Sequence, residues 1–462
     1  MPLLHPAVWT PKIRAGTRDA KPGLARGGEE TRKPAPRARE SRERTLFELT
    51  ATDYLRASPF VSRSRMASVR PFRALRPAPE FAEQVASVPY DVVSVDEARE
   101  LAADNPHSFL HVVRPEIDLP EGTDEHADTV YEGGAEALTR LAASEAFVQD
   151  DAPGLYVYRL VMNGRAQIGI VGLVSAEAYD NGGILKHENT RPDKEDDRTR
   201  HIETQQAHAE PVMLSYRAEA AIDDAVAEAM EAEPLYDFTA KDYVQHTVWR
   251  LPAETAALFE PVEALYVADG HHRCAAAARV ARAAGAPAEA AHFLAVLFPM
   301  EEMEILAYNR VVKKLPVGKN KFLEQMRRRF EVEEALFPEP DEPGVVAFYL
   351  GEDTGWHTLL LPETERDGVA DTLDVARLSE FVLEPIGITD PRTDANIAFV
   401  GGIRGTEELE RLVNTGEAEV AFSMFPTGMD ELLDVSDAGE LMPPKSTWFE
   451  PKLRSGLLVH PF

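Results

Sequence analysis

Residues 264–280, ALYVADGHHRCAAAARV, bring charged side chains to the junction of an apolar run and an alanine-rich run. The apolar run predicts a strand and the alanine-rich run predicts a helix. Gly270 lets the backbone approach a ligand closely, and the first N–H groups of a helix have no partner within it. Because an anion satisfies such groups, we expect this elbow to bind phosphate. The expected phosphate ligands are Gly270, His271, His272 and Arg273.

Asp269 lies in the same turn, where it could orient a histidine or hold a cation such as Mg²⁺. The alternative is structural: two buried histidines cap the helix and Arg273 pairs with a carboxylate. Burying these groups without a compensating anion is costly, which favours the functional interpretation. For the neighbouring Cys274, the helix start could lower the thiol pKa, whereas the alternative is a small, packed side chain.

A second polar cluster is KHENT at 186–190, with Arg191, Arg198, Arg200 and His201 downstream. Glu188 could act as a general base if it lies within hydrogen-bond reach of a hydroxyl. The alternative is that KHENTRPDKEDDR at 186–198 is a solvated surface loop, because runs of mixed charge usually lie at the surface. Residues 182–211 as a whole predict a polar loop. A metal site built from His187, His201 and His208 is a further alternative, although no metal-ligand spacing recurs.

A third cluster, PPKST at 443–447, lies near the end of the chain. Its lysine and hydroxyl groups offer hydrogen-bond donors, and the alternative is a structured turn. The candidate substrate-binding residues are Lys445, Ser446 and Thr447.

The composition limits the class of protein. The 462 residues are 44% hydrophobic and carry a formal net charge of −30, which predicts a globular protein of two or three domains. An acidic body disfavours nucleic acid as a partner. The sequence lacks an apolar run long enough to span a membrane and lacks the apolar core of a secretory signal, so we expect a cytoplasmic location. The single cysteine excludes an internal disulfide framework.

Residues 1–65 differ from the rest of the chain. They hold 14 Lys and Arg against 7 Asp and Glu, and the stretch TRKPAPRARESRER at 31–44 cannot bury a core. We expect a disordered basic tail or an upstream extension, and a nucleic-acid-binding arm is the alternative.

Strand and helix patterns intermix along the remainder, which predicts an α+β or mixed α/β fold rather than a helix bundle or an all-β sandwich. Asn163-Gly164 predicts a hairpin within 154–176. Residues 293–300 and 305–315 predict a second strand pair, and 319–330 predicts a helix. The expected regions are an N-terminal α/β region at 66–180, a core at 181–318 and a C-terminal α/β region at 319–462.

Five ordered motifs resemble the domain of unknown function 1015 (DUF1015) family. They are VPYDVVS at 88–94, LKHENT at 185–190, ADGHHR at 268–273, YNRVVK at 308–313 and MPPKSTWFEPKLRSGL at 442–457. More distantly, the order of the His-Glu loop, the elbow and the Pro-Lys-Ser-Thr segment is similar to the free serine kinases of the ParB/sulfiredoxin fold. That resemblance implies a ParB/sulfiredoxin-like nucleotide-binding core at 181–318. The SVPYDVVS motif has no counterpart in these kinases.

The kinase resemblance implies transfer of a phosphoryl group from ATP or ADP, with Mg²⁺, to the hydroxyl of free serine or a similar metabolite. In this comparison Glu188 maps to the base and Lys445, Ser446 and Thr447 to the substrate side. His187 joins the elbow as a phosphate ligand, and Asp269 and His272 are further catalytic candidates. The alternatives are a ParB-like nucleotide switch that hydrolyses CTP or another nucleotide, and a phosphatase.

Overall fold

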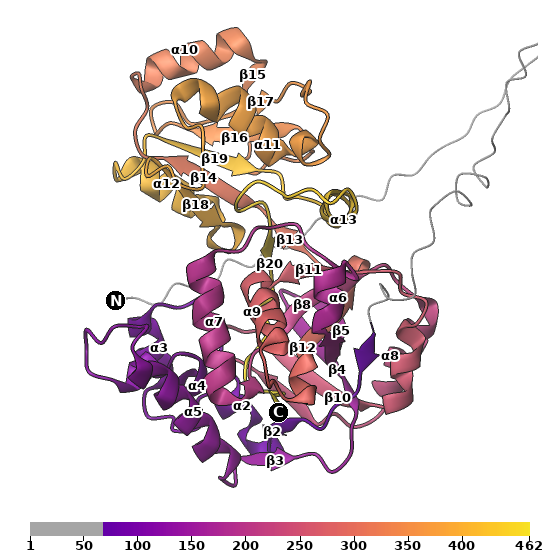
Figure 1. Cartoon of the computed structure of the whole chain (residues 1–462). Coiled ribbons are helices and arrows are strands. Elements are labelled where there is room, and N and C mark those ends of the chain that lie inside the picture. Colours follow the sequence, from indigo (N-terminus) through magenta and orange to yellow (C-terminus); the bar gives the residue numbers. More distant parts are fainter. Residues whose placement is uncertain (1–67) are drawn as a thin grey trace, which may run out of the picture. The chain divides into compact units, whose positions relative to one another are not determined.

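The structure, a computed structural model, describes residues 68–462 (Figure 1). Residues 1–67 lie outside this description, and with them the predicted tail at 1–65.

A mixed nine-stranded sheet carries the elbow. β11 runs parallel to β6, and β12 runs parallel to β8, whereas the other neighbouring strands are antiparallel. Its strand order is β6 (Ile184–Leu185), β11 (Leu265–Asp269), β8 (Val212–Tyr216), β12 (His292–Pro299), β5 (Arg165–Ser175), β4 (Leu155–Met162), β10 (Gln245–Leu251) and β9 (Tyr236–Thr239), and β1 (Val69–Arg70) also pairs with β5.

Both faces of this sheet are buried. Alternate residues of β4 enter different hydrophobic clusters: Tyr156 and Tyr158 pack on one face, and Leu155 and Val157 pack on the other. This division follows from the two-residue period of a strand. Because both faces are covered, the central strands read as continuous apolar runs in the sequence.

The predicted hairpin at 154–176 is confirmed. β4 pairs with β5 through a turn in which Asn163 and Gly164 have φ of 53° and 82°, as a two-residue hairpin turn requires. Gly169 of β5 lies against Phe298 of β12, where a Cβ atom would come within 2.7 Å of the phenyl ring. A glycine is therefore required for the close approach of β5 and β12.

Three helices lie beside the elbow: α6 (Ala176–Asn181), α7 (Pro192–Gln205) and α9 (His271–Arg282). α9 packs against both α6 and α7, and its residues 275–278 are buried alanines that allow close helix contact. The prediction that 182–211 is a polar loop is wrong over α7. The buried side chains of this helix are mostly polar or charged, so the sequence shows no apolar period.

The N-terminal region is mostly helical and has its own hydrophobic cluster. Helix α3 (Val95–Ala102) begins with a capping box between Ser94 and Glu97. The elements of this region are β2 (Leu75–Pro77), α2 (Ala82–Val85), α3 (Val95–Ala102), α4 (Leu110–Val113), α5 (Asp128–Ala142) and β3 (Phe147–Gln149). A further helix, α8 (Ala220–Ala229), lies later in the chain and packs next to β10.

A second, fully antiparallel sheet of six strands forms the C-terminal part of the fold. Its strand order is β15 (Val332–Glu334), β17 (Trp356–Leu360), β16 (Val345–Tyr349), β19 (Val420–Met424), β14 (Tyr308–Val312) and β18 (Ile397–Gly401), with helices α10 (Lys319–Arg329), α11 (Asp374–Leu378), α12 (Gly405–Asn414) and α13 (Met429–Asp437). The helix predicted at 319–330 is confirmed as α10.

The predicted pairing of 293–300 with 305–315 is wrong. β12 pairs with β5 and β8 in the first sheet, whereas β14 pairs with β18 and β19 in the second. Between them, β13 (Ile305–Leu306) pairs with β20 (Trp448–Phe449) near the end of the chain. Sequence proximity suggested a hairpin, but long-range partners take both strands.

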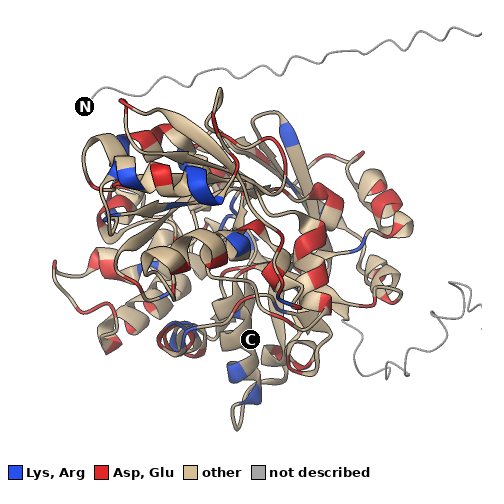
Figure 2. Cartoon of the chain, turned by 90° about the horizontal axis from the view of Figure 1, so that it is seen from above, with Lys and Arg blue, Asp and Glu red and all other residues tan. Residues whose placement is uncertain are grey.

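The fold is thus a mixed α/β structure with several sheets, in agreement with the predicted mixture of strands and helices. The residue limits of the regions and the ParB/sulfiredoxin-like core stay predictions. The predicted boundary at residue 180 would place β5 and β12 in different regions, although these two strands pair in one sheet. Acidic side chains outnumber basic ones along the described chain (Figure 2). None of the helices between residues 68 and 462 has the length and apolarity that a membrane crossing requires.

Candidate functional site

The elbow has the predicted strand–turn–helix geometry. β11 ends at Asp269, Gly270 has φ of 97°, and α9 begins at His271. No side chain caps the start of α9, so its first N–H groups are available to an acceptor. A Cβ atom on Gly270 would lie 3.0 Å from Nε of Arg273. Both the left-handed backbone and this close contact favour glycine.

Arg273 packs beneath the elbow. Its buried guanidinium donates from Nη1 to the Pro211 carbonyl, and its Nη2 lies 3.9 Å from Asp269. Burial by itself would lower the pKa of Arg273, but Asp269 and Glu210 raise it above its ordinary value. Arg273 does not line the two cavities described next. Its predicted contact with phosphate stays a prediction.

Two cavities meet at Glu188. The larger has a volume of about 1010 Å³ and the smaller about 150 Å³, and Glu188, Asp91 and Lys445 line both. The structure thus brings the second and third sequence clusters together. The larger cavity is also lined by basic and polar side chains that include Arg114, Arg191, Lys194, Arg198, His272 and Arg392, and the smaller one by Asp269, His271, Tyr308, Thr447, Trp448 and Lys452.

Glu188 has the environment of a base. Burial raises the pKa of its carboxyl, and nearby Asp269 adds to this effect, whereas Lys445 and Arg392 act in the opposite direction. The net result is a pKa above the ordinary glutamate value. A carboxylate with a raised pKa accepts a proton more readily than an exposed one.

The segment at 442–447, which contains the third polar cluster, is held at this site by hydrogen bonds of its backbone. The N–H of Met442 donates to the His187 carbonyl at 2.8 Å, and the Lys445 carbonyl accepts from Nη2 of Arg310 at 3.1 Å. Lys445 has φ of 60°, and its Nζ lies 5.5 Å from the centroid of the Tyr308 ring. The YNRVVK motif of β14 therefore positions the Lys445 backbone.

The two hydroxyl residues after Lys445 have different surroundings. Ser446 is buried, its Oγ donates to the Pro443 carbonyl, and it lines neither cavity. Thr447 lines the smaller cavity. Of the two, Thr447 is the one placed to contact a ligand.

The elbow histidines divide between the cavities. His271 is buried, lines the smaller cavity, and has an Nε2 without a partner in the described chain. The His187 ring lies 4.4 Å from it and nearly perpendicular. Burial lowers the pKa of His187 to about 4 and that of His271 well below the ordinary value. Both rings are therefore neutral near pH 7. His272 lines the larger cavity, and its Nε2 accepts from the Arg191 N–H at 3.0 Å.

Asp269 is paired with Lys452, whose Nζ lies 3.0 Å from its Oδ2. Burial alone would raise the pKa of Asp269, but Lys452 and Arg273 hold it well below its usual range. No group of three or more metal-ligating side chains occurs among residues 68–462. Mg²⁺ commonly takes only one or two carboxylates together with phosphate oxygens and waters, so the ionised Asp269 carboxylate fits such a site.

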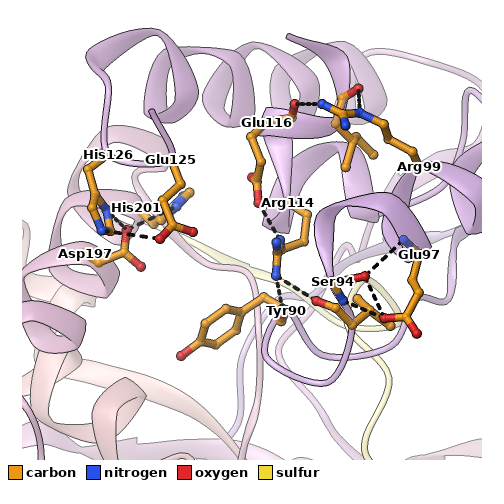
Figure 3. Close-up of polar contacts among 12 residues, drawn as sticks. Tyr90, Ser94, Glu97, Arg99, Arg114, Glu116, Glu125, His126, Asp197 and His201 are labelled. Carbon is orange, nitrogen blue, oxygen red and sulfur yellow. Dashed lines mark hydrogen bonds and ion pairs between the residues drawn. The ribbon is translucent and has the colours of Figure 1, made fainter. Parts of the chain in front are cut away.

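The N-terminal region forms a wall of the larger cavity (Figure 3). The Tyr90 ring covers the Arg198 guanidinium at 3.8 Å, and Nη1 of Arg114 donates to the Tyr90 carbonyl at 2.6 Å. Buried Asp197 accepts from the Tyr131 hydroxyl at 2.9 Å and lies 3.3 Å from Nδ1 of His126. None of these N-terminal residues was among the predicted site residues. The SVPYDVVS motif could have indicated them, because its Tyr90 and Asp91 line the larger cavity.

Cys274 is fully buried, and burial raises the pKa of its thiol to about 12. The hypothesis of a lowered thiol pKa is therefore wrong. The apolar surroundings of α9 outweigh the nearby Arg273, and Cys274 is a packed small side chain.

The family model described as a protein of unknown function (DUF1015) matches residues 69–376. The chain belongs to this family. Four of the five motifs that carried the resemblance lie inside the match, and the segment at 442–457 lies beyond it. No curated protein sequence matches the chain.

Several solved structures align with the chain at low similarity. A conserved hypothetical protein from Pyrococcus furiosus has 14% identity and a TM-score of 0.32, covering 62% of this chain and 94% of that one. A free serine kinase in complex with AMP has 13% identity and a TM-score of 0.33, covering 62% and 90%. SbnI from Staphylococcus aureus, with a C-terminal truncation, has 13% identity and a TM-score of 0.35, covering 63% and 87%.

Proposed function

We propose that this member of the DUF1015 family is a phosphotransferase that moves a phosphoryl group from a nucleotide to the hydroxyl of a small metabolite, with free serine as the first candidate. The observation that carries the proposal is the position of Glu188, a half-buried carboxylate with a raised pKa where two cavities meet. Lys445 lines both cavities beside it. A base and a cation at one point are what transfer to a hydroxyl requires.

The nucleotide phosphates bind at the elbow. The uncapped start of α9 supplies N–H donors, and His271 supplies an unpartnered Nε2 in the smaller cavity. Because His271 is neutral near pH 7, it contributes a hydrogen bond and not a charge. Arg273 acts from beneath: it holds the elbow to Pro211, and its charge favours an anion above it.

The acceptor hydroxyl lies between Glu188 and Lys445. Glu188 takes the hydroxyl proton as the oxygen forms its bond to the terminal phosphorus, and the bond from that phosphorus to the bridging oxygen of the nucleotide breaks. Lys445 stabilises the negative charge of the phosphoryl group during transfer. The products are a phosphate ester and a nucleotide one phosphate shorter. Thr447 is placed to hydrogen-bond the acceptor.

Mg²⁺ accompanies the nucleotide, and Asp269 would hold it together with phosphate oxygens and waters. When bound, the cation neutralises phosphate charge. Until then Lys452 balances the Asp269 carboxylate. We also propose that residues 181–318 form a ParB/sulfiredoxin-like core that binds the nucleotide.

The test is a turnover assay with ATP or ADP and free amino acids, in which O-phosphoserine and the spent nucleotide are both measured. We expect O-phosphoserine to form only when serine is present. Glu188→Gln should reduce transfer at least about 100-fold and leave nucleotide affinity near the wild-type value, because only the base is lost. Glu203→Gln, an exposed change on α7, is the matched control.

Two outcomes would contradict the proposal. Nucleotide hydrolysis that proceeds at the same rate without any acceptor would indicate a nucleotide switch or a phosphatase. Full transfer activity in Glu188→Gln would remove Glu188 from the role of base.

A further inference from the structure

A third cavity, of about 370 Å³, lies beside the bridge between Ser87 and Ser455. Each of these residues donates its N–H to the carbonyl of the other, at 3.1 and 2.9 Å. The cavity shares no lining residue with the two cavities at Glu188. It lies between the N-terminal region and the turn from β9 to β10, and it is a separate site.

Arg454 is the buried charge in this cavity. Its side chain is only 4% exposed, and its Nη2 contacts the Asp242 carboxylate. The guanidinium carries further N–H donors on Nε and Nη1. A guanidinium is planar and binds a carboxylate best through two donors. The remaining donors therefore favour a further anionic group inside the cavity.

The cavity nevertheless carries both signs of charge. Arg454 and Lys241 are balanced by Asp242 and Glu83 among its lining residues. A simple anion would meet the two carboxylates as well as the two cations. A ligand with one group of each sign is complementary to all four.

The rest of the lining is suited to a small organic molecule. The hydroxyls of Ser87 and Ser108 lie 3.3 Å apart at one side, and Val88, Leu101 and Leu110 supply apolar surface. The volume lies near the lower end of the range of roughly 300–1,000 Å³ that is usual for small-molecule sites.

We propose that this cavity binds a free α-amino acid. Its carboxylate contacts Arg454 and Lys241, its ammonium group contacts Glu83 and Asp242, and its side chain lies against Leu101 and its apolar neighbours. This inference is independent of the phosphotransferase proposal, because none of its residues takes part in that site.

The test uses the full chain, without nucleotide, and three probes: L-leucine, acetate and ethylamine. Leucine carries both charged groups and has no hydroxyl, so it cannot be an acceptor at Glu188. We expect leucine to bind saturably by calorimetry and to raise the melting temperature. Acetate and ethylamine each carry one of the two groups, so we expect neither to match leucine.

Two variants separate binding from folding. Lys241→Glu changes an exposed side chain and should weaken leucine binding roughly tenfold, because it replaces an attractive charge with a repulsive one. Leu101→Trp, at the partly exposed rim, should block the cavity. Lys321→Glu on α10 makes the same charge change outside the cavity and should bind leucine as the wild type does.

The proposal is overturned if leucine does not bind, or if acetate alone reproduces the effect of leucine. It is also overturned if both Lys241→Glu and Leu101→Trp bind leucine like the wild type. Leucine binding in Glu188→Gln should be unchanged, so failure here and failure of the phosphotransferase proposal give different results.

Discussion

Nη2 of Arg310 donates to the backbone carbonyl of Lys445 at 3.1 Å. The contact joins β14 to a residue 135 positions later, and Lys445 there has a left-handed backbone with φ of 60°. Nη1 of the same guanidinium donates to the Tyr308 carbonyl. One buried arginine thus fixes both the strand and the segment that brings Lys445 to Glu188.

Replacing Arg310 tests this arrangement. Lysine cannot donate to two separated carbonyls as the guanidinium does, so Arg310→Lys leaves a buried carbonyl unpaired at a cost of about 1–3 kcal/mol. We expect a lower melting temperature and about tenfold slower phosphoryl transfer, because Lys445 loses its position. Calorimetry and the turnover assay measure the two effects. Arg328→Lys, at an exposed position of α10, is the control, and wild-type behaviour in Arg310→Lys would contradict the positioning role.

The pH dependence of transfer tests Glu188. The base must be ionised, and its pKa lies above the ordinary glutamate value, so kcat/KM should fall as the pH drops through this raised pKa. Lys445 lowers the pKa of Glu188. Lys445→Gln should therefore move the acid limb of the profile to higher pH, in addition to lowering the maximum rate.

The matched control for that shift is Lys321→Gln, an exposed lysine on α10. It should leave the acid limb in place. An acid limb that stays at the same pH in Lys445→Gln would show that Glu188 does not control the profile.

Two left-handed glycines allow a matched test of the elbow. Gly270 and Gly285 have φ of 97° and 84°, but a Cβ atom would meet Arg273 only at Gly270, with open space at Gly285. Gly285→Ala should cost only the backbone strain, about 1–2 kcal/mol. Gly270→Ala should cost more and, if the elbow binds phosphate as proposed, should also weaken nucleotide binding, since it displaces Arg273. Equal losses of stability and unchanged nucleotide affinity in both variants would argue against this role.

Buried histidines predict a loss of stability in acid. Burial lowers the pKa of His208 to about 3, so between pH 6.5 and 3 the unfolded chain binds a proton that the folded chain does not. Stability is therefore lost as the pH falls below 6.5, by about 1.4 kcal/mol per pH unit for this group.

Urea unfolding of wild type and His208→Phe at pH 6.5 and pH 5 measures this contribution. We expect the free energy of unfolding of the wild type to fall more than that of His208→Phe, by about 2 kcal/mol. His107→Phe makes the same substitution at a half-exposed position and controls for the added phenyl ring. Parallel pH dependence in wild type and His208→Phe would contradict a neutral, buried His208.

The sequence alone determined the local features. The turn at Asn163-Gly164 and the elbow at Gly270 follow from backbone preferences that a few residues impose, and the alanine-rich helix follows from its composition. The three polar clusters were also found from the sequence. Residues of all three line the smaller cavity: Asp269 and His271 from the elbow, Glu188 from the second cluster, and Lys445 and Thr447 from the third.

Only the tertiary structure decided what these features face. α7 was missed because its buried face is Asp197, Arg198 and their polar neighbours, which are stabilised by partners from distant segments. The partners of β14, the burial of Arg273 beneath the elbow and the cavity around Arg454 depend likewise on contacts between residues far apart in the chain. Periodicity and turn chemistry report local geometry, whereas pairing and burial are set by the whole fold.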